Sequence, residues 1–266
     1  MDANVTSLRG GATGGKAVIG EAAEAGGLSS FARNIFSMLE RTEYRRCESG
    51  EDLEAIYRLR YAAYRLNDLV PENPDRMVTD EFDDLPNCHR FGVYVDGNLA
   101  STIRLHVVTA ATPQSPAVSV YPDILLPRLR AGERFIDPSR FAAHPDWMRV
   151  YPQLPYLTLR LAGMACFHFN APHCLSMIRE DHAAFYKRVY KSRPIGEPRG
   201  YDGVINCAAT LYQADVLAIQ DETFARFPFF WSSKVEQRLM FGATAKGEPA
   251  PLTILPTARY MDRAAA

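Results

Sequence analysis

The chain has 266 residues, of which 47% are hydrophobic and 23% are charged, a composition typical of a globular protein with one large or two small domains. Its 30 Lys and Arg residues nearly balance its 31 Asp and Glu residues, which leaves a formal net charge of −1. The overall charge therefore gives no reason to expect binding to nucleic acid or to an anionic membrane.

The cysteines and the N-terminal residues indicate a cytoplasmic protein. The five cysteines are odd in number and form no C-x-x-C pair, which argues against a disulfide framework and against a zinc site. The N-terminal residues show no basic region followed by an apolar core, so we expect no secretory signal. No apolar run approaches the roughly 18 residues of a membrane span, so we expect no transmembrane segment.

The first 27 residues are rich in glycine and alanine and poor in large apolar side chains. Such a segment cannot bury enough surface to offset the entropy lost on ordering, so we expect a flexible tail over residues 1–27. Helical spacing of four apolar residues then predicts a short docking helix within residues 28–43: Phe31, Ile35, Phe36 and Leu39. We expect the main domain over residues 44–238 and a C-terminal extension over residues 239–266.

An arginine interrupts the apolar stripe of the next predicted helix, which starts with a capping signal at residues 49–52. The stripe consists of Leu53, Ile56, Tyr57, Arg60 and Tyr64. In one interpretation Arg60 extends along the helix and places its guanidinium in water. In the other it points inward and pairs with Asp80 and Asp83, which follow the loop over residues 67–78. Taken alone, the acidic run at residues 80–84 is typical of a solvated turn.

A β-hairpin is predicted next, with strands over residues 91–95 and 99–108 around the turn Asp96-Gly97-Asn98. Alternation puts Thr102, Arg104 and His106 on one face of the second strand. That face is either the wet side of the sheet or, if helices cover both sides, the wall of a cleft in which Arg104 holds a carboxylate.

A short strand over residues 135–142 carries Asp137 and Arg140 among apolar residues. Pro138 cannot donate to a sheet ladder, so we expect this strand to lie at an edge or to bulge at Pro138. Bulges re-aim side chains and often border active sites. A purely structural Asp–Arg pair is the alternative interpretation.

The second half alternates helices and strands. We expect helices over residues 156–170 and 180–190, and strands over residues 174–178 and 204–211. Antiparallel strands thus come first and β-α-β units follow. This order predicts an α/β (α+β) fold with a mixed, mostly antiparallel sheet and helices on both faces.

The four polar clusters, in this order, resemble a known family. The chain is similar to the acyl-homoserine-lactone (autoinducer) synthases and, more closely, to the long-chain N-acyl amino acid synthases, both of the GNAT-type acyltransferase superfamily. The matching positions are Arg60 with Tyr64, Asp80 with Asp83, Arg104, and Asp137 with Arg140 and Phe141. Residues 182–188, 195–197 and 201–204 resemble the N-acyl amino acid synthases in particular. The chain departs from the family in lacking its tryptophan after the first helix and in having Asp for Glu at 137.

The resemblance implies a GNAT-like fold and an N-acyltransferase that joins a long-chain acyl group to the amine of an amino acid. Acyl carrier protein is the expected donor, in preference to acyl-CoA. Residues 158–165, in the region where acetyl-CoA enzymes carry a glycine-rich pyrophosphate loop, have no such turn. A basic patch would dock the carrier protein, unless it is only a solvated helix end: Lys187, Arg188, Lys191, Arg193 and Arg199. We expect no bound cofactor or metal, and membrane contact only at the periphery through a lipid product.

The same resemblance suggests roles for the site residues. Asp137 would accept the proton of the attacking amine, directly or through water. Arg140 and Arg104 would bind the acceptor's carboxylate or order Asp137. The remaining residues would shape the substrate site: Arg60, Tyr64, Asp80, Asp83 and Phe141.

Three other functions stay open at this point: an acyl-homoserine-lactone synthase, an acetyl-CoA-dependent N-acetyltransferase, and a non-catalytic acyl-binding module. Cysteine catalysis is disfavoured. Cys88 and His89 are adjacent in the sequence, and neighbouring residues of a strand face opposite ways.

Overall fold

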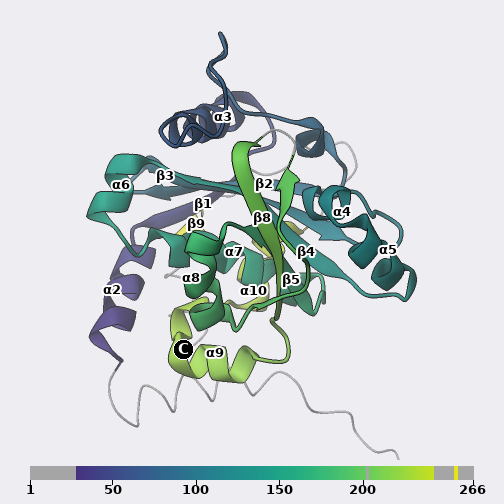
Figure 1. Ribbon diagram of the computed structural model, residues 1–266. Coiled ribbons are helices and arrows are strands. Elements are labelled where there is room, and N and C mark those ends of the chain that lie inside the picture. The colour runs from purple at the N-terminus through teal and green to yellow at the C-terminus, as the bar shows by residue number, and fades with distance from the viewer. Residues whose placement is uncertain (1–27, 202–203, 243–254, 257–266) are drawn as a thin grey trace, which may run out of the picture.

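A mixed β-sheet forms the centre of the molecule (Figure 1). The computed structural model describes residues 28–201, 204–242 and 255–256, so the predicted tail and most of the predicted C-terminal extension lie outside the described residues. Within these ranges the strands follow the order β6-β8-β5-β4-β3-β2-β1-β9, and β7 also pairs with β8. Among the strands that the structure describes, only β4 and β5 are parallel, which confirms the predicted mixed, mostly antiparallel sheet. The strands are β1 (Thr42–Arg46), β2 (Cys88–Val95), β3 (Asn98–Val108), β4 (Phe135–Ala143), β5 (His173–Ile178), β6 (Arg193–Pro194), β7 (Arg199–Tyr201), β8 (Val204–Asp215) and β9 (Leu255–Pro256).

Helices cover both faces of the sheet, as predicted (Figure 1). One face carries α3 (Gly50–Arg65), the 3-10 helix η1 (Glu81–Asp84), α4 (Pro116–Val120) and α5 (Pro122–Arg130). The other face carries α2 (Ser30–Leu39), α6 (Pro145–Val150), α7 (Leu154–His168), α8 (Glu180–Tyr190), α9 (Gln220–Arg226), η2 (Pro228–Phe230) and α10 (Lys234–Phe241). In the part of the chain that the structure describes, no helix is both long and apolar enough to span a bilayer.

Several elements lie where the sequence predicts them. The helices predicted at residues 29–41, 49–64, 156–170 and 180–190 are α2, α3, α7 and α8. The predicted β2–β3 hairpin is present. Its turn residues Asp96 and Gly97 both have positive φ, 49° and 78°, which is the geometry that twisted hairpins prefer. The remaining strands and α-helices were not predicted: β1, β6, β7, β9, α4, α5, α6, α9 and α10.

The helix α7 is fixed in the core by a buried ion pair. Arg160 and Glu236 of α10 are both fully buried, and Arg160 Nη1 lies 2.6 Å from Glu236 Oε1. Arg160 also donates to the backbone carbonyls of Phe229 and Trp231. Charge pairing with further hydrogen bonds allows a guanidinium to be buried. This pair ties the last described helix to the centre of the fold.

The strands β4 and β5 part shortly after they meet. Their described pairing is limited to Phe135 with His173 and Ile136 with Cys174. From Pro138 onward β4 therefore has a strand partner only on the β3 side. A proline without an N–H fits such a position. β4 itself lies inside the sheet, between β5 and β3, so it is not the predicted edge strand, and only its stretch from Pro138 onward lacks a described partner on one side. The sheet is consequently open between β4 and β5.

Candidate active site

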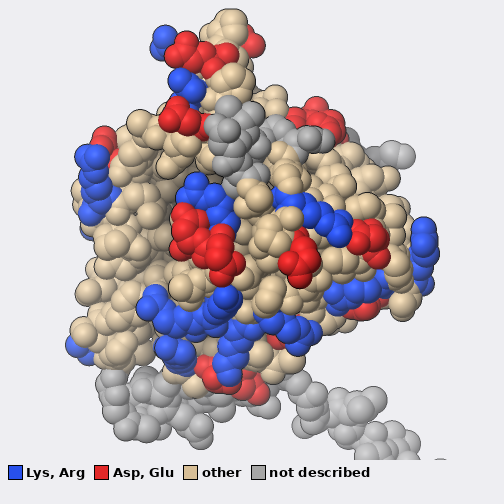
Figure 2. Space-filling view, in the orientation of Figure 1, with Lys and Arg blue, Asp and Glu red and all other residues tan. Residues whose placement is uncertain are grey.

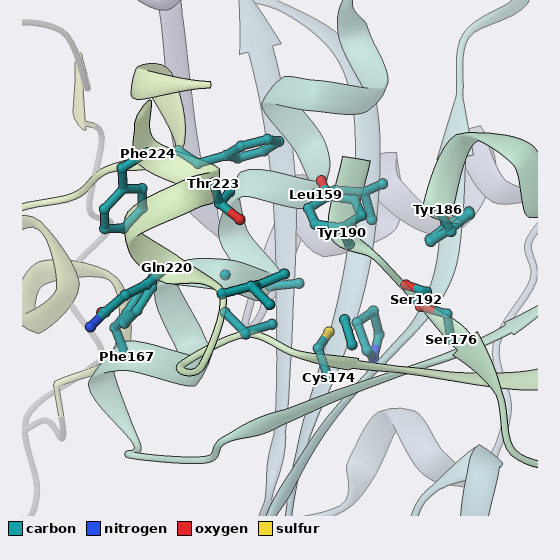
Figure 3. A pocket seen from close by; sticks show the side chains of 17 residues that line it. Leu159, Phe167, Cys174, Ser176, Tyr186, Tyr190, Ser192, Gln220, Thr223 and Phe224 are labelled. Carbon is teal, nitrogen blue, oxygen red and sulfur yellow. The ribbon is translucent and has the colours of Figure 1, made fainter. Parts of the chain in front are cut away.

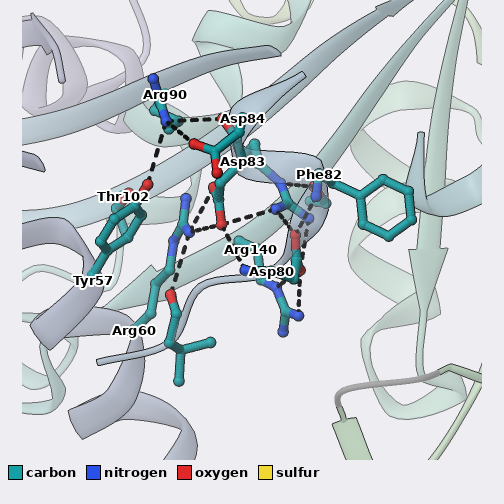
Figure 4. A network of polar contacts seen from close by, with 12 residues as sticks. Tyr57, Arg60, Asp80, Phe82, Asp83, Asp84, Arg90, Thr102 and Arg140 are labelled. Atoms are coloured by element: carbon teal, nitrogen blue, oxygen red, sulfur yellow. Dashed lines mark hydrogen bonds and ion pairs between the residues drawn. The ribbon is translucent and has the colours of Figure 1, made fainter. Parts of the chain in front are cut away.

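Arg60 points inward from α3 and pairs with Asp83 of η1 (Figure 4). Its Nη1 donates to both carboxylate oxygens of Asp83, at 2.9 and 3.0 Å. The side chains are 0% and 2% exposed, so the interpretation with Arg60 extending into water is wrong. Burial of an ion pair requires close pairing, because removal from water is costly. The pair fixes α3 against the segment that follows it.

Asp80 pairs with two other arginines rather than with Arg60. Its carboxylate accepts hydrogen bonds from Arg104 of β3 and from Arg140 of β4, with Arg140 Nη2 at 2.6 Å (Figure 4). Arg104 also lies 3.1 Å from Asp83. The two guanidinium groups hold the pKa of Asp80 down, at about 2. These five residues form one network, here called the Arg–Asp cluster: Arg60, Asp80, Asp83, Arg104 and Arg140.

Arg104 is fully buried and pairs with Asp80 and Asp83, so of the two interpretations of its face the wet side is wrong. The reason is that α3, η1 and α4 cover this side of the sheet. The face contains Thr102 and His106 as predicted, and both are also fully buried. His106 hydrogen-bonds through Nε2 to the carbonyl oxygen of Phe82. Its Nδ1 is buried and has no partner in the part of the chain that the structure describes. Burial lowers the pKa of His106 to about 4, so its ring is neutral at physiological pH.

A β-bulge brings Arg140 into the cluster. Arg104 pairs with Ser139 and Thr102 with Ala142, so Arg140 and Phe141 together face one residue of β3. Arg140 has a φ of 52°, in the left-handed region. Its side chain therefore lies on the same face as Ser139, which accepts a hydrogen bond from Arg104. The bulge is thus at Arg140, not at Pro138 as the sequence suggested, and Phe141 falls on the opposite face.

Asp137 is fully buried on the same face as the cluster. Its Oδ2 accepts a hydrogen bond from the backbone N–H of Ala117, at 2.8 Å, near the start of α4. Its Oδ1 has no hydrogen-bond partner among the described residues. Burial raises the pKa of Asp137 to about 6, although the hydrogen bond from Ala117 acts against the shift. A carboxylate with this pKa is mostly ionised at neutral pH and is suited to accept a proton.

Two tyrosines enclose the guanidinium of Arg140. The rings of Tyr64 and Tyr201 have centroids 5.7 and 5.5 Å from its central carbon. Arg140 Nη1 is buried and has no hydrogen-bond partner among the described residues. Tyr64 was predicted as a site residue, and its place beside Arg140 follows from the helical spacing with Arg60. The contact of Tyr201 with Arg140 was not predicted, since β7 is too short to show a period.

An apolar pocket lies on the other side of β4, between the sheet and α7, α8 and α9 (Figure 3). Its space is about 580 Å³, including the opening to solvent. Pro138 of β4 and Cys174 and Ser176 of β5 line it where those strands part. The rest of the wall is mostly apolar or aromatic: Leu159, Ala162, Gly163, Phe167, Tyr186, Tyr190, Ser192, Ala214, Val216, Ile219, Gln220, Thr223, Phe224 and Phe230. Pro138 thus faces the pocket while its neighbour Asp137 faces the cluster side.

Lys and Arg side chains gather on the face that carries α8 and α9 (Figure 2). Most of the predicted basic patch is paired with acids. Lys187, Lys191 and Arg193 contact Glu180, Glu222 and Asp215 respectively. Arg199 donates to Asp123 and to the backbone carbonyl of Val120, so it links β7 to α4 and α5 and is not a free charge of the patch. Arg188 is exposed and has no acidic partner among the described residues.

The start of α7 lacks a pyrophosphate cradle. Residues 158–165, where the sequence shows no glycine-rich turn, lie inside α7 and not at its start. The helix begins at Leu154, and Pro155 occupies its second position. Proline has no N–H to offer an anion, and the preceding residues 150–153 contain no glycine. The helix α7 therefore begins with a proline and not with a glycine-rich turn.

Comparison with known proteins agrees with this arrangement. The family profile of the N-acyl amino acid synthase FeeM matches residues 55–215. The solved structure of FeeM, an N-acyl amino acid synthase from uncultured soil microbes, superposes with a TM-score of 0.58 at 19% identity, covering 70% of this chain and 98% of FeeM. The structure of BjaI, a CoA-dependent acyl-homoserine lactone synthase, gives 0.50 at 17% identity, covering 67% and 83%. A search of curated protein sequences found no match.

Proposed function

This chain belongs to the family of the N-acyl amino acid synthase FeeM and is an acyltransferase, and from that premise we propose that it forms an amide between a long-chain acyl group and the amine of an amino acid. The observation that carries the proposal is the two-sided environment of β4. An apolar pocket lies on one side, and the Arg–Asp cluster with Asp137 lies on the other. The acyl chain would occupy the pocket, and the polar acceptor would lie on the cluster side.

The parted strands β4 and β5 give the two substrates a place to meet. The thioester would lie in the opening beyond Ile136 and Cys174, where β4 has no described strand partner on the β5 side. The unpartnered Nη1 of Arg140 would donate to the acceptor's carboxylate. Tyr64 and Tyr201 would hold that guanidinium in place, and Arg104 would keep Asp80 directed toward it.

In the reaction a C–N bond replaces a C–S bond, and one proton moves from the amine nitrogen to the leaving sulfur. The amine nitrogen attacks the thioester carbon, a C–N bond forms, and the C–S bond breaks. The amine loses a proton to Asp137 Oδ1, directly or through one water, and this proton passes to the leaving thiolate. The free Oδ1 and the raised pKa of Asp137 support this role. Arg60 and Asp83 would hold the wall of the site and take no part in the chemistry.

Acyl carrier protein is the proposed donor. A carrier-bound thioester presents no nucleotide pyrophosphate, which agrees with the proline at the start of α7. The exposed Arg188 would contact the acidic surface of the carrier, supported by its neighbours on α8. BjaI is described as CoA-dependent, so donor choice needs a direct test.

Mass spectrometry of organic extracts from cells that overproduce the protein tests the proposed function. We expect a new N-acyl amino acid, whose mass identifies the acyl length and the acceptor together. The purified protein should then make the same compound from acyl carrier protein thioesters. An acyl-homoserine lactone would reassign the acceptor, acetylated amines formed only from acetyl-CoA would reassign the donor, and tight acyl binding without any amide would reject catalysis.

The pH dependence of the reaction should reflect the protonation of Asp137. Its pKa of about 6 means that the carboxylate is protonated below this pH and cannot accept a proton. We expect kcat/KM to fall by an additional tenfold per pH unit below about pH 6, beyond the effect of amine protonation. Asp80, with a pKa of about 2, stays ionised throughout. A profile with the same break in an Asp137→Asn variant would assign the break to another group.

Reversal of charge at Arg188 should weaken use of the carrier-bound donor. We expect Arg188→Glu to raise KM for acyl carrier protein by roughly tenfold at low salt, with the difference shrinking as salt increases. KM for the matching pantetheine thioester, which lacks the carrier, should stay the same. Arg130→Glu on α5 is the matched control, since this exposed arginine lies on the opposite face of the sheet. Equal effects of both variants would argue against docking at α8.

A further inference from the structure

Gly163 lies well inside α7, which runs from Leu154 to His168. Glycine in the interior of a helix lowers stability relative to alanine, because the unfolded chain has more conformational freedom to lose at a glycine. The other residues of this helix carry side chains, and most of them are buried. A glycine at this place therefore calls for a reason, either a close contact with another element or a need for space.

The packing of α7 does not require this glycine. Apart from the adjacent backbone of its own helix, a Cβ atom on Gly163 would meet no atom of the described residues within 4 Å. The opposite is found at Gly92 of β2, where a Cβ atom would lie 2.7 Å from the ring of Tyr94. Gly163 also has no positive φ, unlike three other described glycines: Gly50, Gly97 and Gly132. An alanine would thus fit at position 163 without displacing a neighbour, and what the glycine provides is empty space.

That space is part of the apolar pocket. Leu159, Gly163 and Phe167 follow one another at intervals of about one helical turn, so they lie on one stripe of α7, and all three line the pocket. Gly163 is therefore a gap between two large side chains, and the three residues are here called the α7 notch. The ring of Phe167 packs against Phe224 of α9, at a centroid distance of 5.5 Å. Figure 3 shows this pair toward one end of the pocket and Ser176 of β5 toward the other, with Leu159 between them.

We propose that Gly163 makes the pocket selective for long acyl chains, because the α7 notch leaves the space that the chain itself fills. The inference rests on the proposed function only in taking this pocket as the acyl site. A chain that starts where β4 and β5 part, beside Pro138 and Ser176, would run past the α7 notch toward Phe167. A side chain at position 163 would block that path, so only the part of the chain before the block would be buried. Each methylene left outside lowers the affinity about fourfold.

Binding of fatty acids of two lengths provides a test that does not depend on catalysis. Radiolabelled octanoic and hexadecanoic acids are equilibrated by dialysis with the full-length wild-type, Gly163→Ala, Gly163→Leu and Gly200→Ala proteins. The readout is the Kd of octanoic acid divided by the Kd of hexadecanoic acid. A loss of folded protein weakens the binding of both acids equally and cancels in this ratio. Gly200→Ala is the matched control, because a Cβ atom on Gly200 of β7 would also meet no described atom within 4 Å, and Gly200 does not line the pocket.

We expect this ratio to fall roughly tenfold or more in Gly163→Leu, because the leucine side chain takes the place of about two or more methylenes of the long acid. The smaller side chain of Gly163→Ala should lower it about twofold to fourfold. Gly200→Ala should keep the wild-type ratio. A folded Gly163→Leu protein with the wild-type ratio would overturn the inference. If Gly163→Leu does not fold, the wild-type ratio in Gly163→Ala has the same meaning.

Thermal unfolding of Gly163→Ala checks why the helix contains a glycine. Its thermal midpoint should rise by about 1–4 °C, because alanine favours the helix and has room at this position. A lower midpoint would mean that packing requires the glycine, which contradicts the inference. Acyl transfer assayed in parallel separates the two proposals: absence of amide product rejects the proposed function, while the binding ratios still decide the role of Gly163.

Discussion

Replacement of Asp137 by asparagine should lower kcat/KM for amide formation by roughly 10²–10⁴-fold, the range typical of a lost general base. Asparagine keeps the shape of the side chain and still offers an oxygen to the N–H of Ala117. It cannot accept the amine proton at Oδ1. The thermal midpoint should therefore change by no more than about 2–4 °C. Steady-state kinetics with a carrier-bound donor and calorimetry on the same sample provide the two measurements.

Asp137→Ala separates the proposed catalytic role from the structural one. Alanine also leaves the N–H of Ala117 without an acceptor in a buried position, which should cost about 1–3 kcal/mol in the free energy of unfolding. The two variants should thus be equally inactive but unequally stable. An Asp137→Asn protein with full activity would remove Asp137 from the mechanism and leave it as a capping residue of α4.

Asp83→Leu should reduce the free energy of unfolding by about 3–5 kcal/mol, because it leaves the Arg60 guanidinium buried without its carboxylate. Arg60 has few other contacts that could compensate. Within the described ranges its Nε and Nη2 atoms are buried without partners, and Nη1 lies 3.5 Å from the carbonyl oxygen of Val78. Typical total stabilities are about 5–15 kcal/mol, so the loss is large. Chemical denaturation of the purified variant measures it.

Two further variants test whether the loss of stability comes from the buried ion pair of Arg60 and Asp83. Glu54→Ala removes the carboxylate of an exposed pair with Arg58 on the same helix, and it should cost no more than about 0.5 kcal/mol. The double variant Arg60→Met with Asp83→Leu removes both charges, and it should be more stable than Asp83→Leu alone. If Asp83→Leu costs no more than Glu54→Ala, then Arg60 does not depend on its carboxylate partner.

The sequence was sufficient to predict the fold class and the members of the Arg–Asp cluster. Helical spacing places Arg60 on the apolar stripe of its helix, which marks this charge as unusual. Strand alternation places Arg104 on the same face as Thr102 and His106. Both prove fully buried. The partner of Asp80 was predicted wrongly. That pairing depends on how η1 lies across β3 and β4, which is a tertiary contact without a local signal. The chemical roles of these residues remain proposals.

The local geometry around Asp137 could not be predicted for two reasons. A left-handed residue is uncommon for arginine, so nothing in the sequence marks Arg140 as the bulge. The helix α4 is only five residues long, too short to show a helical period. Its start does have a signal, since Ser115 accepts from the N–H of Val118 and Pro116 occupies the first helical position. A helix that starts there has a backbone N–H at Ala117 without a partner inside the helix, and this N–H is the hydrogen-bond partner of Asp137.

The two-sided environment of β4 has a consequence for how such enzymes diversify. The residues that would contact the acyl chain come from α7, α8 and α9. The residues that would form the acceptor site come from α3, η1 and the bulge in β4. Substitutions on opposite faces of a sheet share few contacts, so their effects should add almost independently. Chain length and acceptor identity can then evolve as separate traits, and a library that varies one face should retune one trait while preserving the other.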